Sequence, residues 1–117
     1  MNAVAGHGWA CEICGLAAGS ITLDEHADVR RESFTSVLTR ELGGAANGKL
    51  RAALAAGDAA AVYALDPELA PWWCPACGRS YCGDHWLRWD VFDEDEPSWH
   101  DSIRGRCPEG HERMLED

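Results

Sequence analysis

The sequence contains very little basic charge. Lys49 is the only lysine, and the nine arginines form no cluster larger than Arg30-Arg31. Proteins that bind nucleic acid normally present a basic stripe that neutralises phosphates. Because the formal net charge is -10 over 117 residues, we expect no nucleic-acid partner.

Long apolar runs are also missing. No segment approaches the roughly 20 apolar residues that a membrane-spanning helix requires. Residues 1–7 have neither the basic start nor the apolar run of a secretory signal. We therefore expect no membrane partner and a cytoplasmic location, in which the cysteines stay reduced. A disulfide framework is the alternative, and it would require an oxidising compartment.

The cysteines and two of the histidines fall into four close pairs. Three pairs have the two-residue gap of a zinc knuckle, and the fourth has a gap of three residues. Eight donors would complete two tetrahedral Cys3His sites, so we expect two Zn2+ ions per chain. The pairs are Cys11/Cys14, Cys74/Cys77, Cys82/His85 and Cys107/His111. Gly78 and Gly83 each directly follow a cysteine, and at these two glycines we expect the positive φ that a tight knuckle favours.

Three alternatives to this ligand set stay open. One site alone could bind zinc while the other thiols are buried. His100 could replace His111, although His111 shares a knuckle with Cys107. The second and third pairs are separated by only four residues, which favours binding to different ions. The alternative is a sequential arrangement, in which the first pair shares an ion with the second and the third with the fourth. The interleaved arrangement places Cys11, Cys14, Cys82 and His85 in site 1 and Cys74, Cys77, Cys107 and His111 in site 2.

The expected sites have no position left for catalysis. A catalytic zinc keeps one coordination position open for water, whereas here side chains fill all four. The chain also lacks the His-Glu-x-x-His motif and the His-x-Glu motif of zinc deaminases. No cysteine outside the pairs is available as a nucleophile. We therefore expect structural zinc ions and no catalytic residue.

The remaining segments predict a helical insert between the first two pairs. Thr22 and Glu25 have the spacing of a capping box, and apolar residues from Phe34 to Leu42 recur at helical intervals. The sequence thus predicts a helix that begins near Thr22 and ends at Gly43-Gly44, after a short strand at 21–23. Further helices are predicted at 49–56, 58–65 and 87–92, the last beginning near 84–85, and a strand is predicted at 102–106. We expect one zinc-binding domain over 1–117, with a zinc core at 9–21 and 72–113 and a helical insert at 22–70.

The eight-donor layout resembles the cross-brace zinc fingers, which include RING and FYVE domains. The central Cys-x2-Cys-x4-Cys-x2-His spacing is similar to FYVE domains, but their basic cluster is absent, and Ala70-Pro71-Trp72-Trp73 stands there instead. Cys11-Glu12-Ile13-Cys14 and Cys107-Pro108 are similar to RING motifs. The resemblance implies a small α+β, treble-clef-like fold. The gap of 59 residues between the first two pairs is longer than RING domains usually have.

Two functions follow as hypotheses. The RING resemblance implies an adaptor that recruits a ubiquitin-like conjugating enzyme without forming a thioester itself. In that role Ile13 and Pro108 would form the apolar platform, and Arg113 would be the hydrogen-bonding linchpin. The alternative is a zinc-stabilised protein-binding module unrelated to conjugation. Trp86 is a further candidate for partner binding, and we expect one or two tryptophans near the zinc core to be partly exposed.

Overall fold

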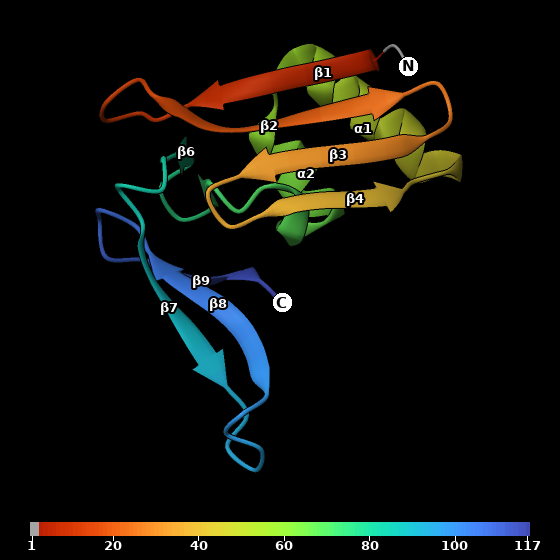
Figure 1. The fold of residues 1–117 in the computed structure, drawn as a ribbon. Helices are drawn as coiled ribbons and strands as arrows, with labels where there is room; N and C mark the ends of the chain where they lie inside the picture. Colours follow the sequence, from red (N-terminus) through yellow and green to blue (C-terminus); the bar gives the residue numbers. More distant parts are fainter. Residues whose placement is uncertain (1–2) are drawn as a thin grey trace.

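The computed structural model describes residues 3–117, which form three antiparallel sheets and two α-helices (Figure 1). The first sheet contains β1 (Ala3–Ala10), β2 (Ala17–Asp24), β3 (Asp28–Ser33) and β4 (Val37–Glu41), in chain order. The helices α1 (Gly44–Ala56) and α2 (Ala59–Leu65) cover one face of this sheet, and the short 3-10 helix η1 (Pro67–Leu69) follows them. The second sheet pairs β5 (Trp73–Cys74) with β6 (Arg79–Ser80), and the third contains β7 (Leu87–Phe92), β8 (His100–Arg106) and β9 (Glu112–Glu116).

The helix predicted from Thr22 to Gly43-Gly44 is wrong, because this segment contains the end of β2 and all of β3 and β4. The short strand predicted at 21–23 lies within β2. Ile21 and Leu23 are buried on β2, and Val29 and Arg31 are buried on β3, so the burial alternates with a period of two. The apparent capping box is a hairpin turn. In that turn the Asp24 carboxylate accepts hydrogen bonds from the N–H groups of His26 and Asp28.

The two later helices are confirmed. The predicted segment 49–56 lies inside α1, with Leu50 and Leu54 buried. The predicted segment 58–65 corresponds to α2, whose N-cap Asp58 accepts a hydrogen bond from the N–H of Ala61. The predicted strand at 102–106 lies within β8. The helix predicted at 87–92 is wrong, because this segment forms β7 and pairs with β8.

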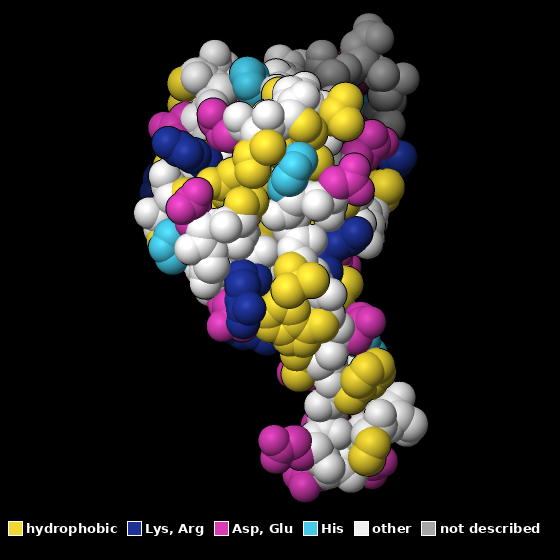
Figure 2. Space-filling view, turned by 90° about the vertical axis from the view of Figure 1, so that its left-hand side faces the viewer, with side chains coloured by type: hydrophobic (Ala, Val, Ile, Leu, Met, Phe, Trp, Pro, Cys, Tyr) yellow, Lys and Arg dark blue, Asp and Glu magenta, His cyan; other side chains and the backbone are white. Residues whose placement is uncertain are grey.

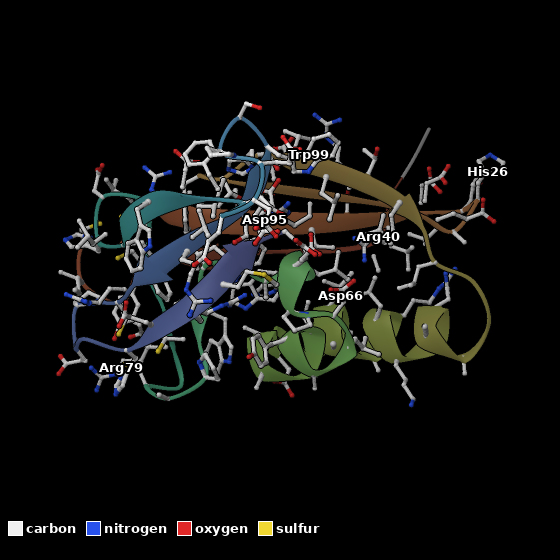
Figure 3. All side chains as sticks on the ribbon, turned by 90° about the horizontal axis from the view of Figure 1, so that it is seen from below. His26, Arg40, Asp66, Arg79, Asp95 and Trp99 are labelled. Atoms are coloured by element: carbon white, nitrogen blue, oxygen red, sulfur yellow. The ribbon has the colours of Figure 1, made fainter. Side chains whose placement is uncertain are left out.

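The larger hydrophobic core lies between the four-stranded sheet and the helices. Trp72 is fully buried at its centre and stacks on Trp9 with ring centroids 5.3 Å apart. Aliphatic side chains from the sheet and both helices surround this pair, including Ile21, Leu23, Leu50, Leu54 and Val62. Figure 3 shows Arg40 of β4 facing Asp66, which follows α2, and the two side chains form an ion pair. This core contains no cysteine.

A smaller core gathers the cysteines around Tyr81, Trp86 and Leu115. It lies where the three-stranded sheet joins the rest of the molecule, and the β7–β8 hairpin extends away from it (Figure 1).

The predicted α+β RING- or treble-clef-like fold with a helical insertion is wrong. Antiparallel sheets dominate the chain, and the helices of the expected insert are confined to the stretch 44–69. Within residues 3–117, no helix is both long and apolar enough to cross a membrane.

Candidate metal centres

Two groups of four side chains could each hold a metal ion. The first group contains Cys11, Cys14, Cys82 and His85, and the second contains Cys74, Cys77, Cys107 and His111. Within each group all four donor atoms lie within 4.8 Å of one another. The side chains are therefore grouped in the interleaved arrangement and not in the sequential one.

The first group joins the turn between β1 and β2 to the segment between β6 and β7. The Nδ1 atom of His85 lies 3.4 Å from Sγ of Cys11 and 3.3 Å from Sγ of Cys82. The Sγ atoms of Cys14 and Cys82 are 3.6 Å apart. Cys14 is exposed, whereas Cys11 and Cys82 are buried.

The second group joins the turn between β5 and β6 to the turn between β8 and β9. The Nδ1 atom of His111 lies 3.7 Å from Sγ of Cys74, 3.2 Å from Sγ of Cys77 and 3.4 Å from Sγ of Cys107. The Sγ atoms of Cys77 and Cys107 are 3.7 Å apart. The backbone N–H of His111 also donates to Sγ of Cys107.

These spacings match a tetrahedral ion with three sulfur donors and one nitrogen donor. Zinc–sulfur bonds of about 2.3 Å and zinc–nitrogen bonds of about 2.0 Å place tetrahedral sulfur atoms about 3.8 Å apart and sulfur and nitrogen about 3.5 Å apart. The cysteines are all free thiols, so the disulfide alternative does not describe this structure. Both groups are geometrically suitable for binding one metal ion each.

Tight backbone turns bring the two donors of each pair together. The N–H of Gly15 donates to the carbonyl of Cys11, and the N–H of Gly78 donates to that of Cys74. Both glycines have positive φ, 75° and 66°, as predicted for Gly78. Gly83 has no positive φ; its role is close packing, because a β-carbon there would lie 2.6 Å from Cβ of Phe34.

The backbone around the first cysteine of two pairs favours the thiolate. Burial raises the pKa of the Cys11 thiol, but N–H groups of Cys14, Cys82 and Ile13 outweigh burial and lower the pKa to about 6. Burial also opposes ionisation of Cys107, yet the N–H groups of His111 and Glu109 lower its pKa to about 7. Burial raises the pKa of Cys74 to about 11. A bound cation would supply the positive charge that four close donors need.

His100, the alternative to His111, lies outside both groups. Its Nε2 atom is 2.9 Å from Oδ1 of Asp90, across the β7–β8 hairpin. Phe92 also contacts the imidazole ring edge-on, with centroids 5.6 Å apart. His100 is therefore part of the hairpin surface.

The family comparison covers the whole chain. A model described as "Domain of unknown function (DUF8328)" matches residues 1–117. The chain belongs to the DUF8328 family. No curated protein and no solved structure matches this DUF8328 chain, so the properties of its site are inferred from its own residues.

The four residues expected to bind a partner do not share one environment. Ile13 is 54% exposed on the first knuckle, and Pro108 is exposed in the turn between β8 and β9. Trp86 is buried, and its Nε1 donates to the carbonyl of Trp72. Arg113 is also buried, and its guanidinium donates to the carbonyls of Pro67, Ala70 and Trp73. Arg113 was expected to act as a linchpin and Trp86 to contact a partner. Both side chains are instead buried and hydrogen-bonded within the protein.

The sequence prediction missed the exposed surface of the β7–β8 hairpin. Leu87 is 62% exposed, Phe92 51% and Trp99 70%, which confirms the expected partial exposure of a tryptophan. Figure 2 shows hydrophobic side chains along this projecting part of the molecule, with acidic side chains at its end. The signal that could have revealed it was the alternation of apolar and charged residues from Leu87 to Val91, which is typical of a strand.

Proposed function

We propose that this chain is a zinc-binding protein-interaction module in which two structural zinc ions hold the β7–β8 hairpin in place for a partner. The observation that carries the proposal is the pair of Cys3His groups, each assembled from turns distant in the sequence. Cys14 and Cys82 are 68 residues apart, and Cys77 and Cys107 are 30 apart. Ions that close such long loops would fix the arrangement of all three sheets.

Zinc is the ion that best suits these donors. Thiolate and imidazole ligands in tetrahedral geometry are typical of structural zinc sites. Because side chains would occupy all four positions, neither ion would keep an open position for water or substrate. Zinc binding would instead contribute to folding, by about 10 kcal/mol in small zinc peptides.

The position of the two sites supports a role in presenting the hairpin. β7 begins two residues after His85, and the turn between β8 and β9 carries Cys107 and His111. The two proposed ions would therefore anchor the three-stranded sheet at the end from which the hairpin projects. Exposed aromatic residues such as Trp99 are frequent in the centres of protein interfaces.

A RING-type adaptor is the narrower form of this proposal, and it has less support. The exposure of Ile13 suits a platform for a conjugating enzyme. The burial of Arg113 and Trp86 does not suit contact with a carrier protein. The test is the rate of discharge of a thioester-loaded conjugating enzyme with and without this protein. We expect the protein not to stimulate discharge. Stimulation that Ile13→Ala abolishes without loss of zinc would favour the adaptor.

Elemental analysis tests the metal sites. We expect two zinc ions per chain in the purified protein, one in Cys82→Ser, and two in the control His100→Ala, whose imidazole lies outside both groups. One ion or none in the wild-type protein would contradict the proposal.

Affinity capture from cells of the source organism tests the partner surface. We expect Trp99→Ser to lose a protein that the wild-type chain captures. The control is Val37→Ser, which changes an exposed apolar residue of β4 (53% exposed) far from the hairpin in the sequence. If both variants lose the captured protein equally, or if neither loses it, the partner surface lies elsewhere.

A further inference from the structure

β7 is an edge strand with an unoccupied side. The three-stranded sheet has the order β7-β8-β9, so β7 has one neighbour among the described residues 3–117. Within residues 3–117, the backbone hydrogen bonds of β7 go only to β8. The outward N–H and C=O groups of such a strand can pair with a further strand, and Figure 1 shows the strand on the outer side of the projecting hairpin.

The sequence of β7 is complementary to itself. Leu87, Trp89 and Val91 alternate with Arg88 and Asp90. In an antiparallel pair with Trp89 opposite Trp89 of a second copy, Arg88 faces Asp90 of the second copy. Leu87 then faces Val91 of the second copy. Opposite charges and apolar side chains directly across a strand pair both stabilise the pairing.

We propose that β7 pairs antiparallel with β7 of a second copy of this chain, so that two three-stranded sheets become one of six strands. This inference rests on the proposed function, because it names the partner of the zinc-anchored hairpin. The arrangement has two-fold symmetry, in which both copies use the same surface and the assembly closes as a dimer. The apolar residues of both strands lie on one face of the joined sheet.

The side chains of Arg88 and Asp90 have hydrogen-bonding groups left for these contacts with the second copy. Nη1 of Arg88 donates to the carbonyl of Phe34 over 2.9 Å, which leaves the other guanidinium N–H groups available. Asp90 uses Oδ1 toward His100 and has a second carboxylate oxygen. Both Arg88 and Asp90 are exposed.

The acidic end of the hairpin favours the antiparallel orientation. Asp93, Glu94, Asp95 and Glu96 are all exposed in this loop. Asp93 comes four residues after Trp89, so the two copies of Asp93 would be about 26 Å apart along the joined strands at roughly 3.3 Å per residue. That separation exceeds the screening length of about 8 Å at physiological ionic strength. A parallel pairing would bring the two acidic loops together.

Charge reversal tests the strand register. Sedimentation of the zinc-loaded full chain over a range of concentrations should show a monomer–dimer equilibrium. We expect Arg88→Asp and Asp90→Arg each to weaken association by about tenfold or more, because each replaces two attractive pairs by two repulsive ones. The double variant R88D/D90R should restore association to within about threefold of the wild type.

Matched controls separate pairing from folding. Arg51→Asp makes the same charge change on an exposed residue of α1 and should leave the dimer unchanged. Circular dichroism and zinc content should be unchanged in every variant. Asp90→Arg keeps the test valid if Arg88→Asp fails to fold, because Asp90 contacts His100 within the same exposed hairpin, whereas Arg88 contacts Phe34 between β3 and β4.

Three outcomes would overturn the inference: a monomer at every concentration, a dimer insensitive to both reversals, or a double variant that stays as weak as the single variants. A monomer that binds a synthetic extended basic peptide at β7 would assign the edge to another occupant and would also overturn it. A monomeric protein with two zinc ions that loses a captured partner through Trp99→Ser would leave the proposed function standing. Absence of zinc would instead remove the proposed function itself.

Discussion

Gly19 of β2 lies directly against the buried ring of Trp72. A β-carbon at this position would overlap the ring atoms Cε3 and Cζ3, and Trp72 has no exposed side on which to move. We expect Gly19→Ala to lower the free energy of unfolding by about 1–3 kcal/mol through overpacking. The control is Gly8→Ala on β1, where the nearest atoms are 4.0 Å away. Equal midpoints of urea unfolding in both variants would contradict the prediction.

Arg113 acts at the residue scale as a link between β9 and the segment that follows α2. Its guanidinium donates to three carbonyls and stands over the ring of Tyr63 at 5.0 Å. We expect Arg113→Met to lower the free energy of unfolding by about 2–4 kcal/mol, because buried carbonyls would lose their donor.

Arg106 provides the matched control on the neighbouring strand. Its contact with Glu112 is an exposed ion pair at 3.5 Å, and such pairs contribute about 0–1 kcal/mol. Arg106→Met should therefore shift the chemical unfolding midpoint far less than Arg113→Met. A similar shift in both variants would mean that the buried hydrogen bonds of Arg113 contribute little.

At the scale of elements, the turn between β2 and β3 contains a strained residue. Ala27 has φ of 65°, a left-handed conformation that costs a residue with a β-carbon about 1 kcal/mol. We expect Ala27→Gly to raise the free energy of unfolding by up to about 1 kcal/mol. The contrasting variant is Ala64→Gly on α2, where glycine should lower it by about 1 kcal/mol. Thermal unfolding measures both, and a loss of stability in Ala27→Gly would contradict the prediction.

The sequence was most informative where chemistry and spacing act locally. The cysteine and histidine pairs required only short turns, and the helices around Leu50 and Val62 had glycine or aspartate at their ends. Of the strands in residues 17–41, only the stretch 21–23 of β2 was predicted. The rest was missed because apolar residues in short runs fit both periods. Thr22 and Glu25 have the spacing of a helix start. Asp24 and Ala27 instead form the turn of a hairpin, and this conformation depends on the pairing of β2 with β3.

The environment of individual residues could not be read from the sequence for a similar reason. Arg113 comes two residues after His111 and therefore resembled an exposed linchpin. Its burial depends on carbonyls that precede it by 40 to 46 residues. The exposed edge of β7 likewise depends on the sheet order β7-β8-β9, in which no other strand of residues 3–117 pairs with β7. Such nonlocal contacts form only in the complete fold.

At the scale of the whole molecule, the two cores differ in what holds them together. The larger core around Trp72 consists of aliphatic and aromatic side chains from one sheet and two helices. The smaller core consists mainly of cysteines, with Tyr81, Trp86 and Leu115. Burial of apolar area can stabilise the first core without a metal. The second brings several thiols together, and we expect its stability to depend on the proposed ions.

This difference predicts how the molecule responds to metal removal. Amide hydrogen exchange measured with and without a zinc chelator should show that β7, β8 and β9 lose protection first, because both proposed sites border their sheet. Other contacts still link that sheet to the rest, including the bonds from Ser36 Oγ to Glu116 and the buried Arg31 beside it. Arg113 adds its hydrogen bonds to Pro67, Ala70 and Trp73. We expect these contacts together to contribute less than two bound ions. α1, α2 and β2 should keep most of their protection, since their side chains belong to the metal-free core. Simultaneous loss of protection in the four-stranded and three-stranded sheets would mean that the larger core also depends on zinc. Unchanged protection in β7 would mean that the ions do not anchor the hairpin.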